Sequence, residues 1–358
     1  MIVLDVVKIF VPATVAFFIG IASTPLLTHY LYRNAMWKKR AGKKALDGGE
    51  TPIFNELHKN KEVGTPKMGG IIIWSAAFLT TVGLWFLAKA FPGDITYKLD
   101  FLSRNQTWLP LFTLLLGGLV GLIDDFLEIK GNGGHVGGGL SLKKRLLVVS
   151  LIGLAAALWF YFKLEVHSIG LPFYGDFEIG WLFIPLFILV TLGIYSGGVI
   201  DGLDGLAGGI FATLFAAYGG IAFYQNQINL AAFCAVVAGS ILAFLWFNIP
   251  PARFYMSETG SMGLTLTLAV VAFMTDSLGE GHGIIALPLI AFPLVITTFS
   301  DIIQILSKKF RGGKKVFLVA PIHHHFEALG WPAYKVTMRF WVIGVVFALI
   351  GMIVAMIG

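Results

Sequence analysis

Acidic residues form three clusters whose types and spacing suit the binding of a divalent metal ion. The clusters are Asp124 and Asp125 in GLVGLIDDFLEIK, Asp201 and Asp204 in VIDGLDGLAGG, and Glu258 in SETGS. Mg²⁺ is usually bound by one or two carboxylates and completed by oxygens of substrate phosphates. The bound ion neutralises the charge of a phosphate as it leaves. The clusters therefore predict Mg²⁺-dependent chemistry on a phosphate-bearing substrate.

Each acidic cluster also has a simpler structural interpretation. Asp124 and Asp125 can be an ordinary polar helix end, although adjacent acids repel one another unless a cation is near. The spacing of Asp201 and Asp204 predicts that they share one face of a helix, whose N-terminus they can cap. Glu258 can cap the helix that follows its polar turn, and the same N-terminus offers backbone N–H groups to phosphate. A capping role and a ligand role are compatible.

Histidines and lysines stand near these acids. Three adjacent histidines in PIHHHFEALG (321–330) cannot all face one way on a helix, so a single three-histidine metal site is not expected. One or two of them can donate to phosphate, and the alternative is a solvated loop. Lys59, Lys61 and Lys67 lead into GTPKMGG. The basic group at 143–145 is interpreted mainly as topology-setting charge in contact with anionic lipid.

The elements that position these residues must be membrane-spanning helices. The chain has 358 residues, of which 57% are hydrophobic and 13% charged, against about 45–50% and about 25% in soluble domains. Spanning helices need about 20 apolar residues, and we expect ten: 9–32, 70–91, 107–127, 145–162, 180–197, 205–224, 229–247, 262–275, 284–306 and 337–357. The eighth is short and is expected to be tilted or shallow. The predicted fold is all-α, a polytopic membrane bundle forming one domain over 1–358.

The distribution of charge predicts the topology. Five of the 26 Lys and Arg residues lie on the side of the amino terminus, which leaves 21 on the other side with all the acidic clusters. The positive-inside rule places the richer side in the cytoplasm and both termini outside. The net charge of +6 is thereby explained by the membrane, and no nucleic-acid partner is expected. A transporter or channel is the competing class, but the clustered acids lie at the ends of the spans rather than in their middles.

The ordered motifs resemble a known family. GTPKMGG, the DD pair at 124–125, DGLDGLAGG, ETGS and PIHHHFE together resemble the phospho-N-acetylmuramoyl-pentapeptide transferase (MraY) family, within the polyprenyl-phosphate sugar-1-phosphate transferase superfamily. The resemblance covers nearly the whole chain. It implies a Mg²⁺-dependent enzyme of the bacterial cytoplasmic (inner) membrane, active on the cytoplasmic face. That enzyme moves phospho-MurNAc-pentapeptide from UDP-MurNAc-pentapeptide to undecaprenyl phosphate, forming lipid I and UMP, and it is expected to be a homodimer.

The resemblance also assigns roles to residues by position. It implies that Asp124 is the base that deprotonates the lipid phosphate, and that Asp124, Asp125 and Glu258 bind the metal. His324 joins the acidic pair as a catalytic residue. Tyr255 matches an aromatic position that stacks on uracil. The expected substrate-binding residues are Lys61, Asp201, Asp204, Asn248, Tyr255, Ser261, His323 and His325.

Four departures from the family pattern surround the expected metal. Glu258 stands where Asp is usual, Gly198 where an Asn is often found, Glu128 in place of the lysine of DDxxK, and Lys67 in place of a threonine. An inactive homologue is therefore one alternative. Another is a transferase of the same superfamily that uses UDP-GlcNAc or a similar donor. A direct attack by the lipid phosphate and a route through a phospho-aspartate both remain open.

Overall fold

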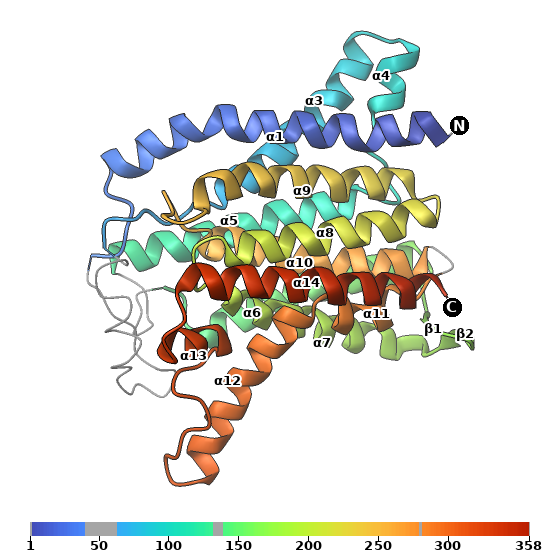
Figure 1. The fold of residues 1–358 in the computed structure, drawn as a ribbon. Coiled ribbons are helices and arrows are strands. Elements are labelled where there is room, and N and C mark those ends of the chain that lie inside the picture. The colour runs from blue at the N-terminus through green and yellow to red at the C-terminus, as the bar shows by residue number, and fades with distance from the viewer. Residues whose placement is uncertain (1, 40–62, 132–138, 279–280, 358) are drawn as a thin grey trace.

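The structure is a computed structural model in which residues 2–39, 63–131, 139–278 and 281–357 are described (Figure 1). Helices dominate the described residues, with one short antiparallel hairpin of β1 (Ser168–Leu171) and β2 (Gly175–Glu178). The α-helices are α1 (Ile2–Arg33), α3 (Ile71–Ala90), α4 (Asp94–Leu99), α5 (Trp108–Lys130), α6 (Leu142–Leu158), α7 (Phe183–Ser196), α8 (Leu206–Tyr224), α9 (Ile228–Asn248), α10 (Ser257–Ser277), α11 (Gly283–Ile290), α12 (Phe292–Phe310), α13 (Ile322–Ala328) and α14 (Ala333–Met356). Short π or 3-10 turns are Trp159–Lys163, Gly180–Leu182 and Gly197–Ile200.

The long helices form one bundle of membrane-spanning length. Within the described residues, nine helices are long and apolar enough to cross a membrane, and the bent pair α11 and α12 makes a tenth. Both termini lie at the same end of the bundle, as an even number of spans requires (Figure 1). The all-α membrane bundle expected from the sequence is confirmed. The assignment of the termini to the outside of the cell stays a prediction.

Helix α10 lies at the centre of the bundle. In its most apolar 18-residue window 94% of the residues are buried, against 22% for α1. The expectation of a short, shallow eighth span at 262–275 is wrong, because α10 is a full span of 21 residues. Its serines, threonines and glycines lower its hydropathy, but they face other helices rather than lipid. Small residues of this kind allow membrane helices to approach closely.

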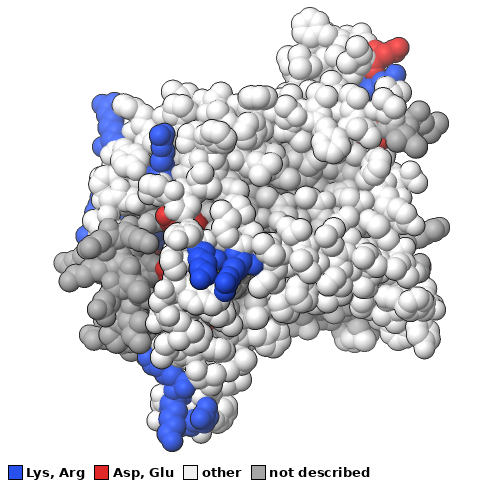
Figure 2. Space-filling model, in the orientation of Figure 1, with Lys and Arg blue, Asp and Glu red and all other residues white. Residues whose placement is uncertain are grey.

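The ninth expected span, 284–306, is broken. Helices α11 and α12 meet at an angle of 68° around Ala291. Pro293 stands in the first turn of α12, where its missing N–H is tolerated. Helix α12 leaves the bundle at a steep angle, and its far end carries a basic cluster (Figures 1 and 2).

Glycine contacts fix the position of the acid-bearing end of α5 against α10. A Cβ added to Gly121 would lie 2.0 Å from the carbonyl oxygen of Glu258, and one added to Gly117 would lie 2.9 Å from Cα of Gly263. The backbones therefore touch where any larger residue would separate them. This packing brings Asp124 and Asp125 beside the first turn of α10.

Candidate active site

Asp124 is buried among polar groups near the end of α5. Its side chain is fully buried. Oδ1 accepts a hydrogen bond of 2.6 Å from the backbone N–H of Leu140, and Oδ2 lies 2.8 Å from Nη2 of Arg145. Burial of a carboxylate requires this kind of compensation. The carboxylate is thus held in place by one backbone donor and one cation.

Arg145 joins two helices that carry site acids. Its Nη1 donates to Oε1 of Glu258 at 2.6 Å while Nη2 pairs with Asp124, and Nε donates to the carbonyl of Leu140. The carboxylates of α5 and α10 therefore converge on one guanidinium group. The sequence interpretation of 143–145 as topology-setting charge missed this role. The signal available was that Arg145 is the one arginine in that group, since the planar guanidinium fork suits two carboxylates better than a lysine does.

Asp125 points toward the start of α10. Its Oδ2 accepts hydrogen bonds from the backbone N–H and the hydroxyl of Thr259, at 2.9 and 2.6 Å. Its Oδ1 is buried, lies 3.9 Å from Nζ of Lys67, and accepts no hydrogen bond within the described part of the chain. Asp125 is therefore held by Thr259 through Oδ2, while Oδ1 has no hydrogen-bond donor among the described residues.

Lys67 and Glu128 form an ion pair beside Asp125. Nζ of Lys67 lies 2.5 Å from Oε2 of Glu128. Burial lowers the pKa of the Lys67 ammonium, but the charges of Glu128 and Asp125 outweigh burial, so the pKa lies above its usual value. Lys67 is consequently charged at neutral pH. Lys67 and Glu128, which both depart from the family pattern, thus contact each other. The ammonium of Lys67 stays next to the acidic pair.

We expect the Lys67–Glu128 pair to behave as a coupled unit. Lys67→Met alone leaves Glu128 and Asp125 without their cation and should lower the unfolding temperature in detergent. The double change Lys67→Met with Glu128→Leu should recover part of that loss, with a coupling energy of about 1–3 kcal/mol. Thermal unfolding of the four proteins of the double-mutant cycle measures it. Strict additivity of the two single effects would show that the pair contributes nothing as a pair.

Asp201 and Asp204 lie in a turn that precedes α8. Oδ2 of Asp201 accepts from the backbone N–H of Ser257 at 2.8 Å, and Oδ2 of Asp204 accepts from that of Ala252 at 3.2 Å. The expectation that both acids share one helical face is wrong, because α8 begins only at Leu206. Their spacing instead allows each acid to hold a different point of the loop that leads into α10.

The histidine triplet belongs to the short helix α13. His323 and His324 are buried, and Nδ1 of His324 lies 2.7 Å from Oε2 of Glu327. His325 points elsewhere, and its Nδ1 accepts from the backbone N–H of Leu318. The predicted divergence of the three rings is confirmed, whereas the solvated-loop alternative is wrong for His323 and His324.

Gly202 brings the aspartate turn against the histidines. A Cβ added to Gly202 would lie 2.3 Å from Nε2 of His323 and 2.7 Å from Nε2 of His324. The backbone of the turn therefore lies directly on both rings. Because Asp201 is bonded to Ser257, which precedes Glu258, the histidines and the carboxylates belong to one continuous site.

Gly202→Ala is expected to lower turnover at least about tenfold, because the Cβ of the alanine would displace the rings of His323 and His324. Overpacking of this kind costs about 1–3 kcal/mol. Gly198→Ala is the matched control, since a Cβ there would meet Ser261 at ordinary distances of 3.6 and 3.7 Å. Steady-state kinetics and thermal unfolding of both variants make the comparison. Equal activity of the two variants would contradict the close contact at Gly202.

The remaining predicted residues have mixed outcomes. Asn248 is buried and fully engaged, accepting from the N–H of Gly205 and donating to the carbonyl of Phe254, so its side chain positions loops. The backbone N–H of Tyr255 donates to the carbonyl of Pro66, which ties the GTPKMGG loop to the site. Ser261 is buried one turn beyond Glu258. Lys61 lies outside the described residues.

The carboxylates are of the ligand type that a magnesium ion takes. Among the described residues, no three His, Cys, Asp or Glu side chains form a complete ligand group. Mg²⁺ does not need such a group, because it commonly takes one or two carboxylates and completes its shell with water and phosphate. Asp124 and Glu258 already converge on one positive group, and the buried Oδ1 of Asp125, which accepts no hydrogen bond from the described residues, lies on the same helix end. Oxygen donors in this arrangement suit a hard cation.

The fold and the site define an integral membrane transferase. Residues 107–276 match the sequence profile described as Glycosyl transferase family 4. The chain is 35% identical over 344 residues to a phospho-N-acetylmuramoyl-pentapeptide-transferase of Listeria innocua, covering 95% of this chain and 96% of the relative. A protein of the same name from Geobacillus thermodenitrificans is 33% identical over 350 residues, 96% of each chain. The chain belongs to the phospho-N-acetylmuramoyl-pentapeptide-transferase family, which confirms the resemblance of its motifs.

Proposed function

We propose that the protein transfers phospho-MurNAc-pentapeptide from UDP-MurNAc-pentapeptide to undecaprenyl phosphate, releasing UMP and forming lipid I. The observation that carries this proposal is the continuity of the site. Asp124 and Glu258 converge on Arg145, and Ser257 links Glu258 through Asp201 to the turn beneath His323. Carboxylates for a metal and histidines for a diphosphate thus lie side by side at one end of a membrane bundle.

In the proposed reaction an oxygen of the lipid phosphate attacks the β-phosphorus of the donor. A new P–O bond forms, the bond from the β-phosphorus to the bridging oxygen breaks, and UMP leaves with that oxygen. In this scheme Asp124 accepts the proton of the lipid phosphate. Arg145 holds Asp124 and Glu258 in register, and His324, oriented by Glu327, donates toward the diphosphate.

Mg²⁺, when bound, supplies positive charge that stabilises the diphosphate as the leaving group departs. Glu258 and the acidic pair on α5 would hold it. Glu258 is one methylene longer than the aspartate usual at its position, and its side chain reaches Arg145 from the first turn of α10. The longer side chain therefore still delivers a carboxylate to the same place as Asp124.

We further propose that the site faces the cytoplasm and that two copies associate. Lys and Arg gather at the end of the bundle opposite to the termini, where α5 ends (Figures 1 and 2). Asp124 stands within the last two turns of α5. The positive-inside rule favours the cytoplasm for that end. The homodimer rests on the family resemblance alone.

The choice of donor tests the proposal. Purified protein with undecaprenyl phosphate and Mg²⁺ should release UMP from UDP-MurNAc-pentapeptide and not from UDP-GlcNAc. Release from UDP-GlcNAc alone would establish the alternative transferase activity. Release from neither donor, in a preparation that unfolds cooperatively, would favour an inactive homologue.

A further inference from the structure

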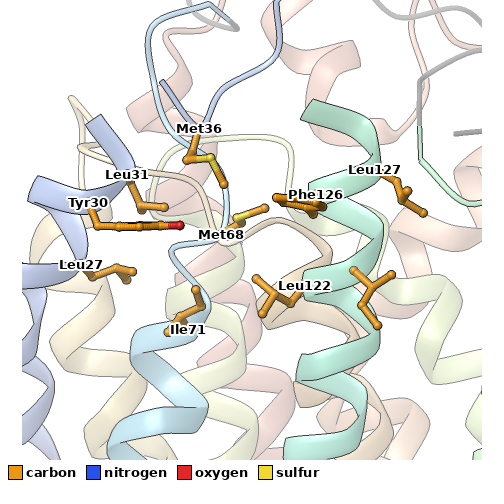
Figure 3. Close-up of a pocket in the computed structure, with 10 residues that line it drawn as sticks. Leu27, Tyr30, Leu31, Met36, Met68, Ile71, Leu122, Phe126 and Leu127 are labelled. Carbon is orange, nitrogen blue, oxygen red and sulfur yellow. The ribbon is translucent and has the colours of Figure 1, made fainter. Parts of the chain in front are cut away.

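An apolar pocket lies between α1, α3 and α5, at the end of the bundle that carries the acids (Figure 3). Its volume is about 370 Å³, within the range of small-molecule sites, about 300–1,000 Å³. In Figure 3, Met68 lies between Tyr30 of α1 and Phe126 of α5. The ten described lining residues include no Asp or Glu. The pocket therefore suits a hydrocarbon group.

The mouth of the pocket lies on the lipid-facing surface of the bundle. Tyr30 and Ile123 are each 57% exposed, and Phe126 is 41% exposed. These residues are within two turns of the ends of α1 at Arg33 and α5 at Lys130. At that depth the hydrocarbon core of a bilayer meets its headgroups. A chain that enters the pocket consequently comes from the surrounding lipid.

Two lysines flank the mouth of the pocket. Nζ of Lys130 lies 4.4 Å from the ring centroid of Phe126, which lines the pocket. Nζ of Lys39 lies 5.5 Å from the ring centroid of Trp37 and donates at 2.7 Å to the carbonyl of Ala35, the chain neighbour of the lining residue Met36. Ammonium groups at headgroup depth attract phosphate. The two lysines at the mouth of the pocket thus favour a lipid with an anionic headgroup over one with a zwitterionic headgroup.

Helix α5 separates the pocket from the catalytic acids. Leu122 and Phe126 line the pocket from one side of the helix, whereas Asp124 and Asp125 stand on the other side and contact Leu140 and Thr259. The two carboxylates therefore face away from the pocket. A headgroup beside Lys130 would lie on the pocket's side of α5.

We propose that the pocket binds one acyl chain of an anionic phospholipid of the bilayer, with its headgroup phosphate at Lys130 and Lys39. The chain fills the space between α1 and α5 directly behind the acidic pair. A bound phospholipid would thereby brace the helix end that positions Asp124. This assignment does not depend on which nucleotide sugar the enzyme uses.

Native mass spectrometry of the detergent-purified protein with phosphatidylglycerol or phosphatidylcholine tests the proposal. The wild type should retain phosphatidylglycerol at concentrations where phosphatidylcholine is lost. Leu127→Trp, which fills the pocket, should weaken retention roughly tenfold, about 1.4 kcal/mol. Leu119→Trp is the matched control because Leu119 is 47% exposed on the same helix and is not a lining residue. Lys130→Gln should lower the preference for phosphatidylglycerol about fivefold.

Three outcomes would overturn the assignment. They are equal retention of the two phospholipids, unchanged retention in Leu127→Trp, and displacement of phosphatidylglycerol from the pocket by equimolar undecaprenyl phosphate. Thermal unfolding checks that each variant is folded, and Leu127→Phe replaces Leu127→Trp if the larger ring prevents folding. The readout is lipid binding, so its failure is distinguishable from a failure of the proposed transferase activity.

Discussion

Asp124→Asn is expected to lower the rate of UMP release at least about 100-fold, the lower end of the effect of losing a general base. Asparagine keeps the shape of the side chain and can still accept from Leu140, but it neither takes a proton nor pairs as an anion with Arg145. Initial rates at saturating donor and acceptor measure the effect. The KM for the nucleotide sugar should change little, because we propose that the donor binds toward the histidines.

Asp94→Asn is the matched control for this variant, since Asp94 is exposed on α4 at the opposite end of the bundle. A Mg²⁺ titration then separates two roles of Asp124. If the residue is mainly a metal ligand, high Mg²⁺ restores part of the rate; if it is the base, the rate stays low. Full activity of Asp124→Asn at ordinary Mg²⁺ would refute the base assignment.

Glu258→Gln is the second change with a large expected effect. The amide cannot neutralise Arg145 and is a weaker ligand for a divalent cation than a carboxylate, so we expect a loss of about 100-fold in turnover, comparable to removing one preorganised electrostatic group. The Mg²⁺ concentration for half-maximal rate should rise as well. Glu258→Asp should retain activity within about tenfold, because it restores the residue usual at this position and keeps the charge.

The pair of Glu258 variants isolates charge from length. If Glu258→Asp were as inactive as Glu258→Gln, the length of the side chain that reaches Arg145 would matter more than its charge. If Glu258→Gln had the turnover and the Mg²⁺ dependence of the wild type, the assignment of Glu258 as a metal ligand would be refuted. Mn²⁺ binding followed by electron paramagnetic resonance gives a readout that is independent of turnover.

The route of the reaction is open to a separate experiment. Direct attack predicts that protein incubated with β-³²P-labelled donor and Mg²⁺, without lipid acceptor, carries no label. Oδ1 of Asp124 accepts a hydrogen bond from Leu140, and Oδ2 lies 2.8 Å from Nη2 of Arg145, so a phosphorylated Asp124 would have to break this arrangement. Stable label on Asp124 would establish a phospho-aspartate intermediate instead.

The sequence predicted the parts of the structure that depend on composition and local pattern. Hydropathy located the membrane helices, and the divergence of the adjacent histidines followed from helical geometry. The tight glycine contacts and the burial of α10 could not be predicted. Hydropathy reports the composition of a helix and not which other helix packs on each of its faces. The same cause explains why the break at Ala291 was missed, since it lies inside one continuous apolar stretch.

Residue roles that depend on tertiary partners were also missed. Arg145 and Lys67 belong to basic groups whose local sequence is equally typical of topology-setting charge. Only the packing of α5 on α10 shows that Arg145 reaches two carboxylates at once. Asp201 and Asp204 were misplaced for a related reason, since spacing alone does not say where a helix begins.

The formation of lipid I by the purified protein tests the central claim most directly. Mass spectrometry should detect one undecaprenyl-diphosphoryl-MurNAc-pentapeptide for each UMP released from UDP-MurNAc-pentapeptide and undecaprenyl phosphate. The product should require Mg²⁺, vanish on chelation with EDTA, and be absent with Asp124→Asn. Lipid I formed at the wild-type rate by Asp124→Asn, or formed in EDTA, would contradict a metal-dependent site built on the acids of α5 and α10.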